Sequence, residues 1–129
     1  MRMDDIINAA REEKWEYVDE RIPQVCDNLE IQERALILLK DSNGNIRDLG
    51  ASIFGKAQNI SKVQFSRAIP ALKTMMNNDS NPYARYRAAF ALAEHAPDKY
   101  RDDIVRVLKE AAKDKDVGKI AKNYLARLK

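Results

Sequence analysis

Apolar residues recur along the chain in one spacing that is repeated four times. An apolar or small residue is followed by a second four positions later, and by an adjacent pair three and four positions after that. Because an α-helix turns once in 3.6 residues, this spacing puts all four side chains on one stripe of a helix. The pattern predicts one type of buried helix built four times. The copies are Val18, Ile22, Val25 and Cys26; Ile46, Gly50, Ile53 and Phe54; Ala84, Ala88, Ala91 and Leu92; and Val117, Ala121, Tyr124 and Leu125.

A second kind of amphipathic stripe precedes each copy of this pattern. Its apolar residues are Ile6, Ile7 and Ala10; Leu36 and Leu39; Phe65, Ile69, Leu72 and Met76; and Ile104, Val107, Leu108 and Ala111. We therefore expect an all-α chain of eight helices arranged in four pairs. Because no pair buries both of its flanks alone, the pairs should stack on one another. The expected domain is 1–129, with approximate repeats at 1–28, 29–59, 60–96 and 97–129.

Polar turn residues lead into the last three pattern helices. They lie at 41–44, 79–82 and 114–116, and most are Asp, Ser or Asn. Such side chains accept hydrogen bonds from the free amides at a helix start, and a proline in the first turn loses no bond there. Each segment is predicted to be a turn that ends in a helix N-cap.

Repeats two and three resemble the HEAT-like repeat family of the PBS-lyase type. The resemblance lies in Asp-x-Asn-x-x-Ile-Arg at 41–47 and Asp-x-Asn-Pro-x-Ala-Arg at 79–85, while the outer repeats match only in their apolar stripe. It implies a right-handed α-solenoid of about four stacked helix pairs. In this family the turn aspartate and the helix arginine usually hydrogen-bond between neighbouring repeats. The resemblance assigns that structural role to Asp41, Arg47, Asp79 and Arg85.

Composition favours a cytoplasmic protein. The chain has 129 residues, of which 45% are hydrophobic and 33% charged. Its longest apolar runs, 35–39 and 88–93, are far shorter than the roughly 20 residues that span a bilayer. Asp4 and Asp5 follow Met3 where a signal peptide needs apolar residues. We therefore expect no membrane partner.

Two segments have the spacing of ligand-binding loops. The segment 50–56 has the glycines and lysine of a phosphate-binding loop, but Ala57 replaces the required Ser or Thr and the segment lies within an expected helix. The segment 41–45 begins like a calcium loop, but Ile46 replaces the glycine of the sharp turn and Ser52 replaces the final glutamate. Neither segment is expected to bind its ligand.

The sequence offers no catalytic cluster. One enzyme branch of the HEAT-like family holds a di-iron centre through repeated His-Glu dipeptides, whereas this chain has the single His95 in the reverse order, near a helix end. The expected roles are a capping or solvated histidine for His95 and a buried thiol for Cys26, which lies on the apolar stripe. We expect no cofactor, no metal site and no enzymatic activity.

Charge is distributed unevenly. Residues 1–40 carry six Lys or Arg against ten Asp or Glu, 41–81 carry five against three, and 82–129 carry twelve against seven, so the net charges are −4, +2 and +5. This asymmetry could steer an anionic partner to the last two repeats or bring protomers together head to tail. It is also typical of a solvated surface without a partner. The oligomeric state stays open.

A candidate binding face follows from the helical geometry. Residues two and six positions after the start of each pattern helix lie opposite the buried stripe, on the side that lines the concave face in the HEAT-like family. In repeat three these residues are Tyr86 and Phe90, which we expect to be exposed anchors with Arg87, Lys119 and Asn123 around them. The alternative is that the two rings pack under a neighbouring repeat or a loop.

The favoured function is a non-enzymatic scaffold that binds a protein segment on the concave face of repeats three and four. The alternative is a nucleic-acid binder, because the alkylpurine DNA glycosylases, a HEAT-like branch, hold DNA with a basic concave face. In that case the aromatic pair would stack on bases and five cations would meet phosphates. Those cations are Arg85, Arg87, Lys119, Lys122 and Arg127. Phosphate binding should collapse as salt rises, whereas an aromatic-anchored protein contact should not.

Overall fold

The computed structural model describes residues 3–128, and within them all regular structure is α-helical. The eight helices are α1 (Met3–Arg11), α2 (Trp15–Val25), α3 (Leu29–Leu38), α4 (Gly44–Lys56), α5 (Lys62–Asn78), α6 (Pro82–His95), α7 (Arg101–Ala111) and α8 (Gly118–Arg127). The prediction of an all-α chain with eight helices is confirmed over this range. The outermost residues of the first and last expected repeats, 1–2 and 129, lie outside it.

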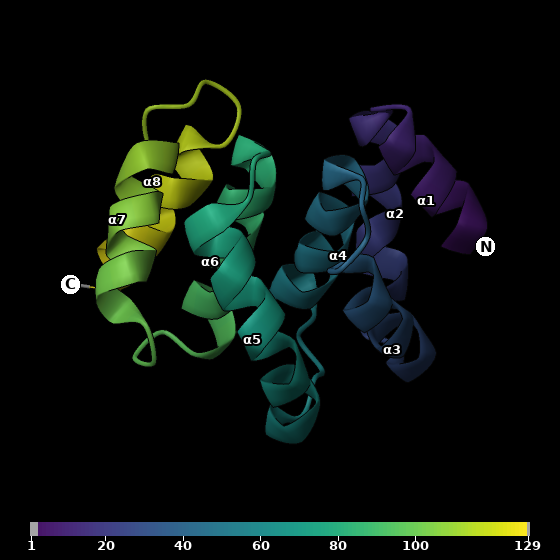
Figure 1. The fold of residues 1–129 in the computed structure, drawn as a ribbon, viewed down its shortest axis with the longest axis horizontal. Helices are drawn as coiled ribbons and strands as arrows, with labels where there is room; N and C mark the ends of the chain where they lie inside the picture. The colour runs from purple at the N-terminus through teal and green to yellow at the C-terminus, as the bar shows by residue number, and fades with distance from the viewer. Residues whose placement is uncertain (1–2, 129) are drawn as a thin grey trace.

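Successive helices pair, and the pairs follow one another across the molecule. Contacts join α1 to α2, α3 to α4, α5 to α6 and α7 to α8, and the second helices also meet in order, α2 with α4, α4 with α6 and α6 with α8. Figure 1 shows the chain progressing from the N-terminus on the right to the C-terminus on the left. The surface formed by α2, α4, α6 and α8 is called the second-helix face below.

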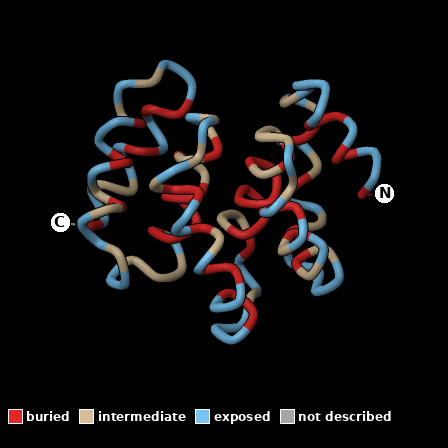
Figure 2. Tube along the Cα trace, viewed as in Figure 1, coloured by how far each residue is buried: buried red, intermediate tan, exposed pale blue. Residues whose placement is uncertain are grey.

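Most of the predicted apolar stripes are buried. Every stripe residue of α4 and α6 is buried, and in the outer repeats only Val25, Tyr124 and Leu125 are partly exposed. Figure 2 shows the buried positions along the helix sides that face other helices, with exposed positions on the turns and outer sides. The helical period therefore identified the core correctly, because burial follows the stripe.

Two glycines allow close approach of backbone segments. A Cβ atom on Gly50 would lie 3.2 Å from the carbonyl oxygen of Ala35, so α4 packs tightly against α3. A Cβ atom on Gly118 would lie 2.8 Å from the carbonyl oxygen of Ala112, a distance that real Cβ atoms do not reach. The last repeat therefore has a glycine where repeats two and three have an arginine, because the turn between α7 and α8 passes directly against this position.

Two of the three predicted helix N-caps are present. The side chain of Asn43 accepts a hydrogen bond from the Asn45 amide at 2.8 Å, and Asn81 accepts one from the Tyr83 amide at 3.0 Å. In the last turn Asp114 accepts bonds from the amides of residues 116 and 117, at 2.7 and 3.0 Å. The first two turns thus end in the predicted N-caps of α4 and α6. The N-cap prediction is wrong for the third turn, because the bonds to Asp114 lie within the turn and α8 has Val117 at its N-cap, without a side-chain bond.

Polar side chains also connect the first helices of adjacent pairs. In each case an arginine on the later helix meets an acceptor on the helix before it. The contacts are Arg34 with Asp4, Arg67 with Glu33, and Arg106 with Asn77. All six residues lie on α1, α3, α5 and α7, so polar contacts link these first helices one after another.

No helix in the range 3–128 is both long enough and apolar enough to cross a bilayer.

Candidate functional site

The aromatic pair that was expected to face solvent is buried. Tyr86 is 7% exposed and Phe90 is 5% exposed, so the prediction that both rings are accessible is wrong. The Phe90 ring stacks on Tyr124 of α8, with centroids 5.5 Å apart and planes at 20°. The Tyr86 hydroxyl lies 3.4 Å from a carboxylate oxygen of Glu110 on α7. Both rings pack under the following repeat, the alternative left open by the sequence.

Tyr124 connects the last two repeats. Its hydroxyl donates a hydrogen bond of 3.1 Å to Glu94 on α6, and the Arg127 guanidinium, 3.3 Å from the same carboxylate, lies 4.8 Å from the Tyr124 ring centroid. Burial and the Glu94 carboxylate raise the pKa of Tyr124 to about 12. The phenol therefore stays protonated and donates at neutral pH. This residue belongs to the apolar stripe, and the stripe pattern gave no signal of its bridging role.

The remaining predicted binding residues differ in exposure. Lys119 and Asn123 are exposed on α8, whereas Arg87 on α6 is partly buried. Lys119, Asn123 and Arg127 are spaced by four residues and so form one exposed stripe, called the α8 stripe below. Of the five predicted binding residues, the two aromatic residues are therefore buried, Arg87 is partly buried, and the two residues on α8 are exposed.

Cations on the second-helix face meet carboxylates of the preceding second helix. The three ion pairs are Lys56 with Asp19 at 3.7 Å, Arg87 with Asp48 at 3.6 Å, and Arg127 with Glu94 at 3.3 Å. Lys119 and Lys122 on α8 form no ion pair with any residue in 3–128. Much of the positive charge predicted on this face is therefore compensated within the protein.

A groove of about 790 Å³ crosses the C-terminal ends of α2, α4 and α6 and reaches α8. Its lining includes Cys26, Lys56, Glu94, His95, Tyr124 and Arg127. The groove therefore draws on all four helix pairs, and repeats three and four supply its charged and aromatic end.

His95 and Cys26 have structural partners in this groove. The Nε2 atom of His95 lies 2.8 Å from the carbonyl oxygen of Phe54, so it acts as the hydrogen-bond donor. The Cys26 thiol lies 3.5 Å from the carbonyl oxygen of Lys56, and burial raises the pKa of this thiol. Both side chains bond carbonyls in the last turn of α4, which lack helical partners. His95 is thus a capping residue, but it caps a helix of the neighbouring repeat.

Asp48 is a buried acid that the sequence placed on the exposed side of α4. It is 4% exposed, and its carboxylate accepts a hydrogen bond of 3.2 Å from Ser52. Burial raises its pKa to about 6, although Arg87 and Ser52 oppose the shift. Asp48 therefore loses its charge in mildly acidic solution, at the junction of α4 and α6.

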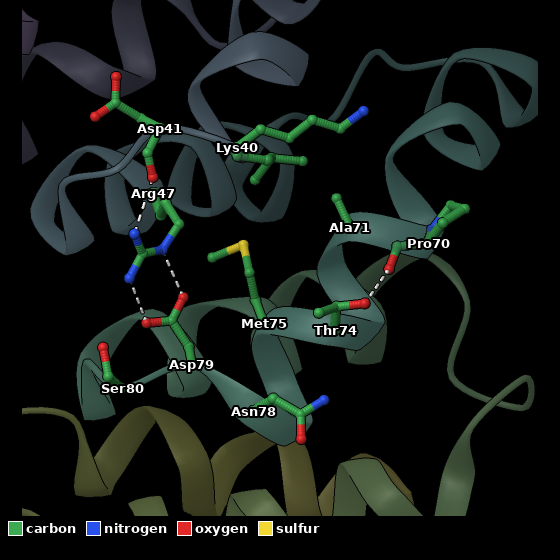
Figure 3. Close-up of a pocket in the computed structure, with 11 residues that line it drawn as sticks. Lys40, Asp41, Arg47, Pro70, Ala71, Thr74, Met75, Asn78, Asp79 and Ser80 are labelled. Atoms are coloured by element: carbon green, nitrogen blue, oxygen red, sulfur yellow. Dashed lines mark hydrogen bonds and ion pairs between the residues drawn. The ribbon is translucent and has the colours of Figure 1, made fainter.

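Arg47 and Asp79 join repeats two and three. Figure 3 shows two parallel hydrogen bonds from the Arg47 guanidinium to the Asp79 carboxylate, both 2.8 Å long, and a third of 2.9 Å to the carbonyl oxygen of Asp41. Burial alone would raise the pKa of Asp79, but the bonds from Arg47 and from the Asn81 amide hold it below its usual value. The Asp79 side chain is only 3% exposed, so this charge depends on its partners.

Arg85 and Asp41 do not form the corresponding contacts. Arg85 bonds Glu110 on α7. The Asp41 carboxylate accepts a bond from the Asn43 amide within its own turn, at 2.9 Å. In the last turn Asp114 receives a bond of 2.9 Å from the Tyr83 hydroxyl. Of the four residues expected to hydrogen-bond between repeats, Arg47 and Asp79 bond each other. Within residues 3–128, Arg85 and Asp41 form no such Asp–Arg bond.

A second groove, of about 660 Å³, lies beside the Arg47–Asp79 pair. Leu39, Pro70, Ala71 and Met75 provide its apolar lining, and Figure 3 shows the Lys40 and Asn78 side chains at its border. The Arg47 guanidinium is already engaged, so this groove offers a free cation only at Lys40.

Within residues 3–128 no group of three or more His, Cys, Asp or Glu side chains is placed to hold a metal ion. Comparisons of the chain with protein-family models, curated protein sequences and solved structures found no match. The functional argument therefore rests on the residues themselves.

Breaking the Arg47–Asp79 pair should destabilise the fold. Because removal of one partner leaves the other charge poorly solvated, Arg47→Ala or Asp79→Ala should each lower the free energy of unfolding by about 2–4 kcal/mol. The double variant should cost less than the sum of the two by about 1–2 kcal/mol. Urea unfolding measures all three. Asp4→Ala, which breaks an exposed pair, serves as a control with an effect below about 1 kcal/mol. Additive single effects would contradict the coupling.

Asp48→Asn should change the pH dependence of stability. In the folded protein the pKa of Asp48 is raised from its ordinary value of 3.8 to about 6. Between these two pH values the folded state binds more protons than the unfolded state, so wild-type stability falls as pH rises. Relative to wild type, the variant should therefore gain about 2–3 kcal/mol between about pH 4 and pH 8. Urea unfolding across this range measures the gain. The exposed Asp5→Asn on α1 is the control, and a gain in stability that does not vary with pH would contradict the assignment.

Proposed function

We propose that the chain is a HEAT-like repeat module, a right-handed α-solenoid, that acts in the cytoplasm as a non-enzymatic scaffold. It binds a protein segment across the second-helix face of repeats three and four. Support for the repeat assignment comes from the four successive helix pairs and from the ordered contacts among α2, α4, α6 and α8. Support for the binding role comes from the groove that crosses these helices.

The observation that carries the binding proposal is the combination of this groove with the α8 stripe. Lys119, Asn123 and Arg127 are exposed, and Ile120 beside them is 39% exposed, which puts an aliphatic side chain next to the stripe. An exposed apolar residue among amide and charged groups is typical of a protein interface. A segment bound here would contact Ile120 and then enter the groove beside Tyr124.

The buried rings Tyr86 and Phe90 support this surface from below. Phe90 stacks on Tyr124, whose ring lines the groove, so the position of α8 depends on α6. The two rings therefore act as positioning residues, and direct contact with the partner falls to the α8 stripe. Because a small array offers limited area, the expected affinity is moderate.

Nucleic-acid binding is the second candidate, favoured by one observation. Residues 82–129 carry a net charge of +5, and Lys119 and Lys122 form no ion pair within the described residues. Against it, Arg87 and Arg127 are held by Asp48 and Glu94, so their charge is already matched. The buried aromatic pair is also unavailable to stack on bases.

Site-specific photo-crosslinking tests the protein-binding proposal. A benzophenone amino acid placed at Asn123, on the α8 stripe, should crosslink one defined protein in nuclease-treated source extract. The same group at the exposed Ser66 on α5 is the matched control and should not crosslink it. Gel electrophoresis and mass spectrometry identify the product. Adding Lys119→Glu to the Asn123 probe should reduce the yield severalfold, because this cation borders the contact. Equal products from both probe positions would contradict a specific face.

A salt titration with labelled DNA tests the second candidate. Since its central cations are paired internally, the wild type should bind a 20-base single strand or duplex more weakly than about 10⁻⁴ M at physiological salt. Fluorescence anisotropy between about 50 and 200 mM salt measures this binding. A dissociation constant of about 10⁻⁶ M or tighter, lost in Lys119→Ala plus Lys122→Ala, would favour the nucleic-acid function instead.

A further inference from the structure

The two ends of the helix array differ in their exposed residues. Apart from Pro23, every exposed residue of α1 and α2 is polar or charged. Such a polar flank is typical of a repeat that caps an array. At the other end α7 and α8 enclose a groove of about 530 Å³ with an apolar floor. Within the described residues, the exposed side chains of the first pair are thus almost all polar, whereas the last pair carries an apolar-lined groove.

The groove between α7 and α8 has an apolar centre with a lysine on each helix. Val105, Leu125, Ala126 and Leu128 line its centre, with Lys109 of α7 and Lys122 of α8 beside them. Val105 and Leu125 are partly buried and Ala126 is exposed, so the floor is accessible. Neither lysine forms an ion pair with any residue in 3–128.

The packing between neighbouring helix pairs indicates which kind of structure could cover this groove. The pair α5 and α6 is covered on its later side by α7 and α8, with contacts from α5 to α7 and from α6 to both. Those contacts join helix to helix through apolar stripes, with charged side chains beside them, as in Arg127 with Glu94. The same packing at α7 and α8 requires a helix with one apolar stripe.

We propose that the groove between α7 and α8 binds an amphipathic helix of a partner protein, whose apolar stripe is flanked by acidic residues. The stripe covers Val105, Leu125 and Ala126, and the flanking carboxylates pair with Lys109 and Lys122. This is helix-in-groove recognition, in which apolar anchors supply affinity and flanking charges set orientation. The groove shares no residue with the α8 stripe or with the groove across α2, α4 and α6, so the proposal does not depend on the proposed function.

A second copy of this chain is a poorer occupant. Its first pair is acidic, since residues 1–40 carry a net charge of −4, and it would match the two lysines electrostatically. However, the large aliphatic residues Ile6, Ile7, Val18 and Ile22 of α1 and α2 are buried, and Val25 is the only one of this pair that is partly exposed, so the pair has no aliphatic stripe for the groove floor. The partner must bring its own apolar stripe.

Two synthetic peptides of about 18 residues test the proposal, both with leucines at helical spacing, one flanked by glutamates and one by lysines. Fluorescence anisotropy with the whole chain should give a dissociation constant at least tenfold lower for the glutamate peptide. Lys109→Glu plus Lys122→Glu should reverse that preference. The control Lys99→Glu plus Lys115→Glu makes the same charge change at exposed turn positions and should leave the preference unchanged.

The Ala126→Gln variant tests where the peptide binds. Ala126 is exposed, so the variant should fold, as circular dichroism can verify, while its longer, uncharged polar side chain occupies the groove and should abolish binding of the glutamate peptide. Equal binding of the two peptides, or binding that survives Ala126→Gln, would overturn the proposal. Light scattering that detects a wild-type dimer lost in Ala126→Gln would also overturn it, because the groove would then be occupied by a second copy.

Discussion

The close packing of α4 against α6 is the constraint on which the rest of the structure depends. A Cβ atom on Gly55 of α4 would lie 3.5 Å from the Cα atom of Ala91, so small residues let the two backbones approach. Helix α6 also contacts α5, α7 and α8, and it is therefore enclosed on several sides. In this setting a side chain opposite the core stripe meets another repeat instead of water. The burial of Asp48 on α4 and of Phe90 on α6 follows from that enclosure.

The helix pattern and the turn chemistry could be predicted from the sequence because both are local. A 3.6-residue period places the stripe, and an asparagine such as Asn43 or Asn81 caps a helix whatever the distant packing is. Exposure of the opposite side is not local, because it depends on where the next repeat lies. The expectation for Tyr86 and Phe90 failed for that reason, although Lys119 and Asn123, on the last helix of the described array, are exposed.

The bonding partners of the charged residues could not be predicted from the sequence either. Arg47 and Arg85 occupy the same motif position, yet one binds an aspartate of the next turn and the other binds Glu110 on the next helix. In the third repeat the aspartate of the next turn, Asp114, instead accepts a hydrogen bond from the Tyr83 hydroxyl. The motif therefore indicates that its arginine bonds the following repeat. Which acceptor it bonds depends on the side chains of that repeat that lie within hydrogen-bond distance.

The internal pairing of charge on the second-helix face determines where recognition is possible. Each carboxylate lies on the earlier second helix and each cation on the later one, as in Asp19 with Lys56 and Glu94 with Arg127. In this order of pairing, Lys56 of α4 and Arg87 of α6 are matched by carboxylates within the protein. On this face, α8 is then the helix whose lysines form no ion pair with residues 3–128. The last helix pair also carries an apolar groove, which is lined by side chains of α7 and α8 and by Leu128. Within residues 3–128, unpaired lysines and partly exposed apolar side chains thus lie together on α8, and a partner that binds there can use both.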